Sequence, residues 1–176
     1  MNHIIEELNA VAALDWNPEQ KAYFVQRAKD ARPVECVRMR DVFTREQMEF
    51  LRKYYRTQRK QCYKNASLLV LLISHPLARG LNWEPVKYIE GFSYAYGLLP
   101  IEHAFVKVGD KYIDPTFERA LHRDVRNESY VSCIELDPDE MGRLQAETGY
   151  YGELYQYSYL KRFRPELAAK MRALRP

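Results

Sequence analysis

Three residues of different chemical types occur in an order that could support nucleophilic catalysis: Cys62, His103 and Asp114. A thiolate can attack a carbonyl carbon, an imidazole can take up and return the proton, and a carboxylate can orient the imidazole. Each type alone is more often structural, since a lone cysteine on an apolar helix is typically a small core residue. Their joint occurrence with Asp114-Pro115-Thr116 favours a site.

The spacing between the histidine and the aspartate predicts a β-hairpin that brings them together. Residues 102–108 and 111–114 have a period of two, and Gly109-Asp110 between them suits a two-residue turn. The expected cross-strand pairs are Val108 with Lys111, Lys107 with Tyr112, Phe105 with Asp114, and His103 with Thr116. His103 and Asp114 then share one face as diagonal neighbours, about 7–8 Å apart between backbones and within side-chain reach. The opposite face is apolar and is predicted to belong to the core.

Cys62 is expected in the first turn of a helix that spans residues 61–73 and ends at His75-Pro76. This helix is apolar on nearly every side, which is typical of a helix buried in the middle of a domain. A thiol at its start feels the positive end of the helix dipole, and a nearby imidazolium would lower its pKa further. The backbone N–H of Cys62 and a side-chain amide are expected to meet the oxyanion, and Gln58 and Gln61 are both candidates for that amide.

The flanking elements are predicted from helix-start signals and from a change of period. Residues 1–60 are expected to be helical, with starts at Asn17-Pro18 and at the capping box of Thr44. Further segments are expected as strands at 86–90, 102–108, 111–114 and 130–136, a turn or short strand at 94–97, a helix starting at 137, and a basic helix at 166–174. The predicted fold class is α+β.

Composition limits the class of protein. A chain of 176 residues with 47% hydrophobic content can bury one core, so a single domain over residues 1–176 is expected. The net charge of +3 does not make nucleic acid the first expectation. The longest apolar run, residues 68–73, is far shorter than the roughly 20 residues that span a bilayer, so no membrane association is expected.

The cysteine pattern and the N-terminal residues predict a cytoplasmic protein. Cys36, Cys62 and Cys133 are widely spaced and odd in number, which argues for a reducing compartment. The first residues carry acids where an export signal needs a basic start and an apolar run. Zinc could in principle use Cys62, His103, Cys133 or Asp114, but no short ligand spacing supports a metal, and no metal or cofactor is expected.

The segment from His103 to Thr116 resembles the core motif of the transglutaminase-like enzymes: a His-Ala-aromatic strand, a Gly-containing turn, an aromatic residue and Asp-Pro-Thr. Cys62-Tyr63-Lys64-Asn65-Ala66 is similar to the start of that family's nucleophile helix, in which a small residue follows the cysteine by four. Where the family often has a glycine two residues before the cysteine, this chain has Lys60. The resemblance covers residues 61–116, about a third of the chain.

The resemblance implies a papain-like fold in which the nucleophile helix packs on a small antiparallel sheet. It divides the domain into a helical part (1–60), a catalytic core (61–136) and a mostly helical part (137–176), with extra helices at both termini. Cys62 would be the nucleophile, His103 the general base and then acid, and Asp114 the orienter. The implied activity is cysteine-dependent acyl transfer through a thioester, by an amide or peptide bond hydrolase, deamidase or transamidase with a protein or peptide substrate.

Aromatic residues around the predicted sheet are candidates for lining the substrate groove, and packing on the sheet face is the alternative. These candidates are Trp83, Tyr94, Tyr96 and Phe105.

Two other functions are compatible with the residues. A catalytically silent papain-like module could bind a protein partner, and an ordinary thiol pKa near 8.5 at Cys62 would favour it. The basic residues between Arg52 and Lys60, together with the basic C-terminus, could instead bind nucleic acid, which predicts a steep salt dependence. Neither the substrate nor the oligomeric state follows from the sequence.

Overall fold

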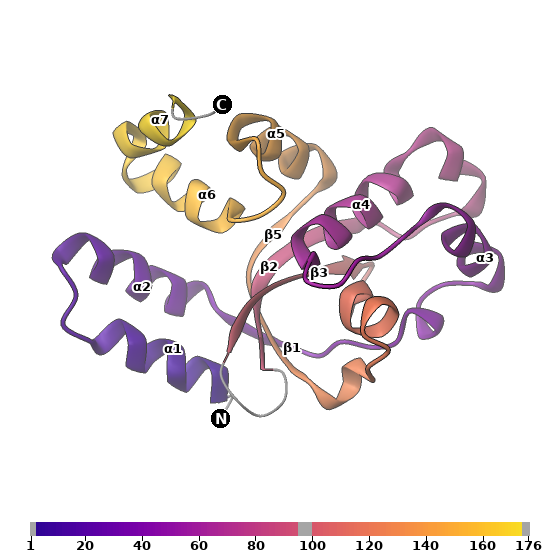
Figure 1. Cartoon of the computed structure of the whole chain (residues 1–176), viewed down its shortest axis with the longest axis horizontal. Coiled ribbons are helices and arrows are strands. Elements are labelled where there is room, and N and C mark those ends of the chain that lie inside the picture. The colour runs from indigo at the N-terminus through magenta and orange to yellow at the C-terminus, as the bar shows by residue number, and fades with distance from the viewer. Residues whose placement is uncertain (1–2, 95–99, 174–176) are drawn as a thin grey trace.

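A five-stranded antiparallel sheet forms the centre of the computed structural model, which describes residues 3–94 and 100–173 (Figure 1). The strand order is β1-β5-β2-β3-β4. The strands are β1 (Arg32–Val34), β2 (Val86–Tyr94), β3 (Ile101–Val108), β4 (Lys111–Ile113) and β5 (Ser129–Leu136). The sheet is curled, because the chain that follows β1 at one edge reaches β4 at the other, where Cys36 forms an isolated bridge with Tyr112.

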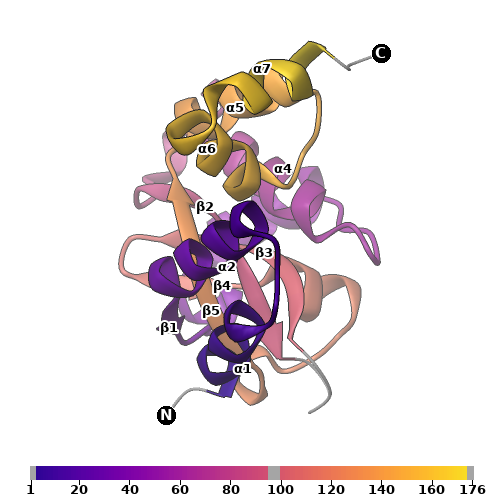
Figure 2. The ribbon, with the colours of Figure 1, turned by 90° about the vertical axis from the view of Figure 1, so that its left-hand side faces the viewer.

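Helices lie at both ends of the chain and against the sheet. They are α1 (His3–Ala13), α2 (Pro18–Asp30), α3 (Arg45–Tyr54), α4 (Cys62–Ser74), α5 (Pro138–Thr148), α6 (Leu154–Phe163) and α7 (Pro165–Ala173). Four short helical turns complete the fold: η1 (Met39–Asp41), η2 (Pro76–Leu81), η3 (Thr116–Ala120) and η4 (Val125–Asn127). Figures 1 and 2 show α1 and α2 as one pair and α5, α6 and α7 as a separate group.

Helix α4 packs on β2 and β3 and provides much of the core. Its buried apolar residues include Ala66, Leu69 and Val70, which belong to the same cluster as Ala104 and Val106 of β3. The prediction of a fully buried helix is wrong in one respect, because Leu71 is 42% exposed. The expected α+β class, the helix packed on an antiparallel sheet and the helices at both termini are all found.

Most predicted element starts are confirmed. Asn17 caps α2 with Pro18 at its start, and Thr44 and Gln47 form the predicted capping box of α3. Gln61 is the N-cap of α4, which ends before Pro76. The three-residue strand β1 lies in the region predicted to be helical. The prediction missed it because a short edge segment with a proline has no readable period and depends on pairing with β5. Residues 95–99, which include most of the turn expected at 94–97, lie outside the described residues.

The predicted hairpin register is confirmed for its first pairs: Val108 with Lys111 and Lys107 with Tyr112. The two further pairs predicted, of Phe105 with Asp114 and of His103 with Thr116, are wrong, since β4 ends at Ile113. The chain turns there because Pro115 cannot donate a ladder hydrogen bond, and η3 follows directly. Strand β4 therefore does not pair with residues 101–105 of β3, which include His103.

Candidate active site

Strand β3 and the residue after β4 bring an imidazole and a carboxylate into direct contact. His103 Nε2 lies 2.7 Å from Asp114 Oδ2, and both side chains are almost fully buried. With a carboxylate as its partner, Nε2 carries a proton and the second ring nitrogen is left for another group. The contact between these two residues that the sequence predicts is thus present, although Asp114 reaches it from a turn and not from the ladder.

The carboxylate of Asp114 is held from three further directions. The hydroxyl of Tyr130 donates to Oδ2 at 3.0 Å, while the backbone N–H groups of Thr116 and Phe117 donate to Oδ1 at 2.9 and 3.0 Å. All these partners are donors, which suits a charged acceptor in a buried setting. Asp114 therefore also stabilises the start of η3, and its orientation is set independently of His103.

Aromatic rings surround the imidazole on the same side of the sheet. The ring of Phe117 lies 4.6 Å from that of His103, and Tyr130 and Phe105 pack nearby. Phe105 has no exposed surface, so its prediction as a groove-lining residue is wrong. It fills the core beneath the imidazole, because an inward position on a central strand excludes solvent whatever the residue type.

The nucleophile candidate Cys62 is the first residue of α4 and is only partly buried. The side chain of His103 and the backbone N–H groups of Ala104 and Tyr63 lie close enough to its sulfur to lower the pKa of the thiol. The Ala104 amide is available because β4 does not extend along this part of β3. The first turn of a helix likewise has N–H groups with no intrahelical partner. All three groups therefore favour the ionised form of the thiol.

These groups favour a negative charge on Cys62 and a positive charge on His103. Burial alone would raise the pKa of the Cys62 thiol, but the hydrogen bond and positive charge of His103 and the two amide donors outweigh it and lower that pKa. Burial alone would lower the pKa of His103, yet Asp114 and Cys62 raise it above its ordinary value. Both shifts favour a thiolate beside an imidazolium.

The other two thiols have the opposite tendency. Burial raises the pKa of Cys36, and it raises the pKa of Cys133 to about 12. All three cysteines are free. Cys62 is therefore the thiol with the greatest tendency to ionise near neutral pH.

Both amide candidates for an oxyanion site, Gln58 and Gln61, precede Cys62 in the chain. The main chain of Gln58 is held by Asn65, which accepts from its N–H at 3.0 Å and donates to its carbonyl at 2.8 Å. Asn65 also donates to Thr116 Oγ1 at 3.0 Å, so it joins the loop before α4 to the turn that carries Asp114. Gln61 precedes Cys62 directly, and its side chain makes no capping bond. The contacts leave both glutamines as candidates.

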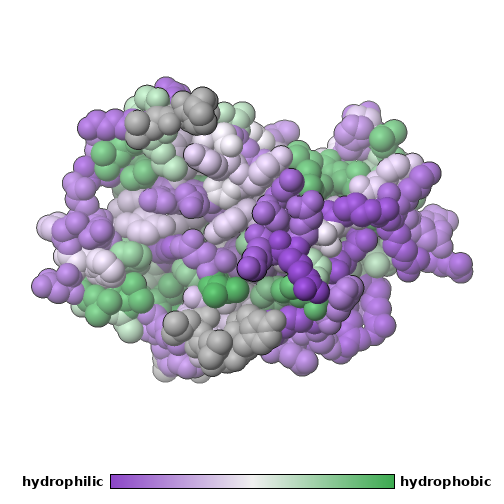
Figure 3. Space-filling model, in the orientation of Figure 1, coloured by the Kyte–Doolittle hydropathy of each residue, from purple (hydrophilic) through white to green (hydrophobic). Residues whose placement is uncertain are grey.

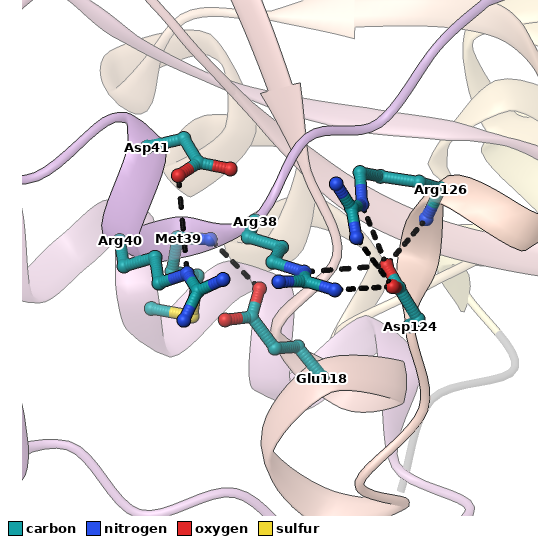
Figure 4. A network of polar contacts seen from close by, with 7 residues as sticks. All are labelled: Arg38, Met39, Arg40, Asp41, Glu118, Asp124 and Arg126. Carbon is teal, nitrogen blue, oxygen red and sulfur yellow. Dashed lines mark hydrogen bonds and ion pairs between the residues drawn. The ribbon is translucent and has the colours of Figure 1, made fainter.

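A polar network anchors η3, which begins two residues after Asp114, to the short turn η1 (Figure 4). Glu118 of η3 accepts the backbone N–H of Met39 at 2.7 Å, and Asp124 forms an ion pair with Arg38. These contacts support the turn that presents Asp114.

The remaining groove candidates lie apart from the triad. Trp83 packs on Phe43 and Phe50 and precedes Val86, which pairs at the opposite end of β3 from His103. Trp83 is only partly buried and packs against the edge of the core, so its place as a groove residue stays a prediction. Tyr94 ends β2 and contacts the ring of His3, and Tyr96 lies outside the described residues.

Two residues of the site were missed from the sequence. Tyr130 lies in β5, two strands away from β3, and only the sheet order brings it to Asp114. Asn65 follows Cys62 by three positions, a spacing that places both on one helix face and could have singled it out.

Comparison with protein-family models, with curated proteins and with solved structures gives no match for this chain. Within residues 3–94 and 100–173, no group of three or more His, Cys, Asp or Glu side chains is arranged to hold a metal ion. In the same part of the chain no helix has both the length and the apolar character needed to cross a membrane.

Proposed function

We propose that this chain is a cysteine-dependent acyl-transfer enzyme with a papain-like, transglutaminase-like core. The observation that carries the proposal is the buried contact of His103 with a four-fold bonded Asp114, with His103 close enough to Cys62 to lower the pKa of its thiol. The lowered pKa of this thiol beside a raised imidazole pKa adds electrostatic support.

The reaction follows from the three groups. The Cys62 thiolate attacks an amide or ester carbonyl carbon, and the carbonyl oxygen takes the negative charge. Collapse of this intermediate breaks the bond to the leaving group, which receives a proton from His103, and a thioester remains. Water or an amine then loses a proton to His103 as it attacks the thioester, and release of the acyl product regenerates the thiolate. Asp114 keeps the imidazole oriented throughout.

The backbone before the nucleophile gives independent support for the family resemblance. Lys60, at the position where that family often has glycine, has a φ of +59°. This left-handed conformation favours glycine and costs other residues about 1–2 kcal/mol. A glycine would adopt this conformation without that cost, so the backbone at Lys60 is compatible with the residue that the family often has there.

The proposal is tested by labelling Cys62 with N-ethylmaleimide as a function of pH in the Cys36→Ala/Cys133→Ala protein. Because the thiolate is the reactive form, the rate should rise with a midpoint below the ordinary value of about 8.5. His103→Gln removes the imidazolium while burial still raises the thiol pKa, so the midpoint should move above that value. Cys62→Ala in the wild-type background should abolish fast labelling.

A labelling midpoint near pH 8.5 that does not change in His103→Gln would contradict the proposed enzymatic function and would favour the catalytically silent, partner-binding module. Comparable labelling of Cys36, Cys62 and Cys133 in the folded wild type would also count against a special role for Cys62.

A further inference from the structure

A pocket of about 620 Å³ lies next to the start of α4. It is lined by the residues on either side of the nucleophile, Gln61 and Tyr63, and by the loop between α5 and α6, which includes Tyr150 and Tyr151. Cys62 itself is not among the lining residues, but both of its neighbours in the chain are, so the backbone of Cys62 borders the pocket. None of the groove candidates predicted from the sequence is among its lining residues.

The pocket carries two lysines with no internal counterion. Lys60 and Lys64 both line it, and among the described residues neither has a carboxylate within ion-pair distance. Glu153 is the single acid in the lining, so the two lysines outnumber it. Strongly hydrophilic side chains also cover the segment between α3 and α4 on the face shown in Figure 3. The approach to the nucleophile is thus basic.

Aromatic surface borders these charges. Tyr150 and Tyr151 are 58% and 45% exposed, and the Lys64 ammonium lies 6.0 Å from the ring centre of Tyr151. Exposed tyrosines beside a cation provide apolar contact area together with a charge partner. The ring of Tyr63 is held in place by the loop, since a Cβ at Gly152 would lie only 2.3 Å from it.

We propose that this pocket selects acidic peptide substrates, with a glutamate or aspartate side chain near the reacting carbonyl placed between Lys60 and Lys64. The proposal rests on the proposed acyl transfer at Cys62 and adds its substrate class. Tyr150 and Tyr151 contact the apolar part of the peptide, while the lysines, as flexible point charges, neutralise the carboxylate.

The test uses two maleimides that differ only by one carboxylate group, in the Cys36→Ala/Cys133→Ala protein. 3-Maleimidopropionate carries a side chain that resembles glutamate, whereas N-ethylmaleimide carries a neutral ethyl group. The ratio of their rates at one pH is independent of the thiolate fraction, because both reagents use the same thiolate. This ratio should fall about tenfold in Lys60→Gln/Lys64→Gln and should also fall when the salt is raised to about 1 M.

Two matched variants make the result specific. Lys87→Gln/Lys111→Gln removes the same amount of charge at the end of strands β2, β3 and β4 that lies away from His103. This variant should leave the ratio unchanged. Glu153→Gln removes the one acid of the pocket and should raise the ratio.

The outcomes separate the two proposals. Cys62 could react fast with N-ethylmaleimide at neutral pH while the ratio is equal in both lysine double variants. This result would overturn the acidic-substrate inference but not the proposed enzymatic function. Slow reaction of Cys62 with both reagents, as for an ordinary thiol, overturns both.

Discussion

At the scale of single residues, Asp114 connects three elements, β3, β5 and η3, through one carboxylate. Its oxygens accept from His103 on β3, from Tyr130 on β5 and from two amides of η3. Such a fully bonded acceptor resists rotation, so the imidazole is kept in one orientation toward Cys62. Tyr130 is a positioning residue in this arrangement, since it acts on His103 only through Asp114.

Tyr130→Phe removes one donor to the buried carboxylate without changing the shape of the ring. We expect the free energy of unfolding to fall by about 1–3 kcal/mol, because the lost partner cannot be replaced by water in the core. Urea unfolding measures this loss. The labelling midpoint of Cys62 should shift as well, since a carboxylate with fewer donors interacts more strongly with the imidazolium.

Tyr112→Phe is the matched control. The Tyr112 hydroxyl donates to Glu135 at 2.6 Å in a partly exposed position, where water can substitute, so its loss should cost less than about 1 kcal/mol. Equal decreases in the free energy of unfolding of the two variants would show that the Tyr130 hydrogen bond contributes no more to stability than that of Tyr112.

At the scale of elements, the start of α4 is fitted closely to the loop between α5 and α6. Gly152 of that loop lies against the ring of Tyr63, the residue after Cys62. This contact joins the C-terminal helices to the site and forms one wall of the pocket beside Cys62.

Gly152→Ala should therefore lower the free energy of unfolding by about 1–3 kcal/mol, because the new methyl group overlaps the Tyr63 ring and the loop must move. The labelling rate of Cys62 should change with it, since Tyr63 supplies one of the amides that lower the pKa of the thiol.

Gly142→Ala provides the comparison within the neighbouring helix α5. Nothing lies within 4 Å of a Cβ at Gly142, and alanine is the better helix former, so this variant should gain about 0.5–1 kcal/mol. Urea unfolding of both variants measures the two changes in the free energy of unfolding. A decrease in Gly142→Ala as large as that in Gly152→Ala would contradict the predicted close contact between Gly152 and Tyr63.

At the scale of the whole molecule, a buried acid connects the sheet to the C-terminal helices. Glu90 of β2 accepts the backbone N–H groups of Leu154 and Tyr155 at the start of α6, and the hydroxyl of Tyr88. Burial raises the pKa of Glu90 from 4.5 to about 7, although these donors act in the opposite direction. The protonated form is therefore favoured in the folded state.

This raised pKa predicts how stability depends on pH. The folded protein holds the Glu90 proton more tightly than the unfolded chain, so the contribution is fully present below pH 4.5 and is lost as the pH rises to about 7. The wild type should lose stability over this window relative to Glu90→Gln, by an amount on the order of a few kcal/mol. Urea unfolding of both proteins across the window measures the difference.

Glu147→Gln is a control with the opposite sign. Lys161 lowers the pKa of Glu147, so its contribution is present at higher pH and is lost as the pH falls. Parallel pH profiles of the wild type and Glu90→Gln would contradict the assignment to Glu90.

The sequence by itself determined the local geometry of the site. Alternation and the Gly109-Asp110 turn set the hairpin register near the loop, and the apolar run after Gln61 set a helix that begins at Cys62. These features depend on backbone preferences over a few residues, which a single sequence records. For the same reason His103 and Asp114 could be expected on one side of the sheet.

Only the tertiary structure decided what surrounds these residues. Tyr130 reaches Asp114 from a strand two places away in the sheet, and the pocket beside Cys62 includes a loop that lies far along the chain. Phe105 shows why a single residue type is not enough, since an aromatic residue suits both a groove and a core and only its burial among distant neighbours decides between them. Strand order and helix packing are set by burial of surface between distant segments, and no local pattern encodes which segments will meet.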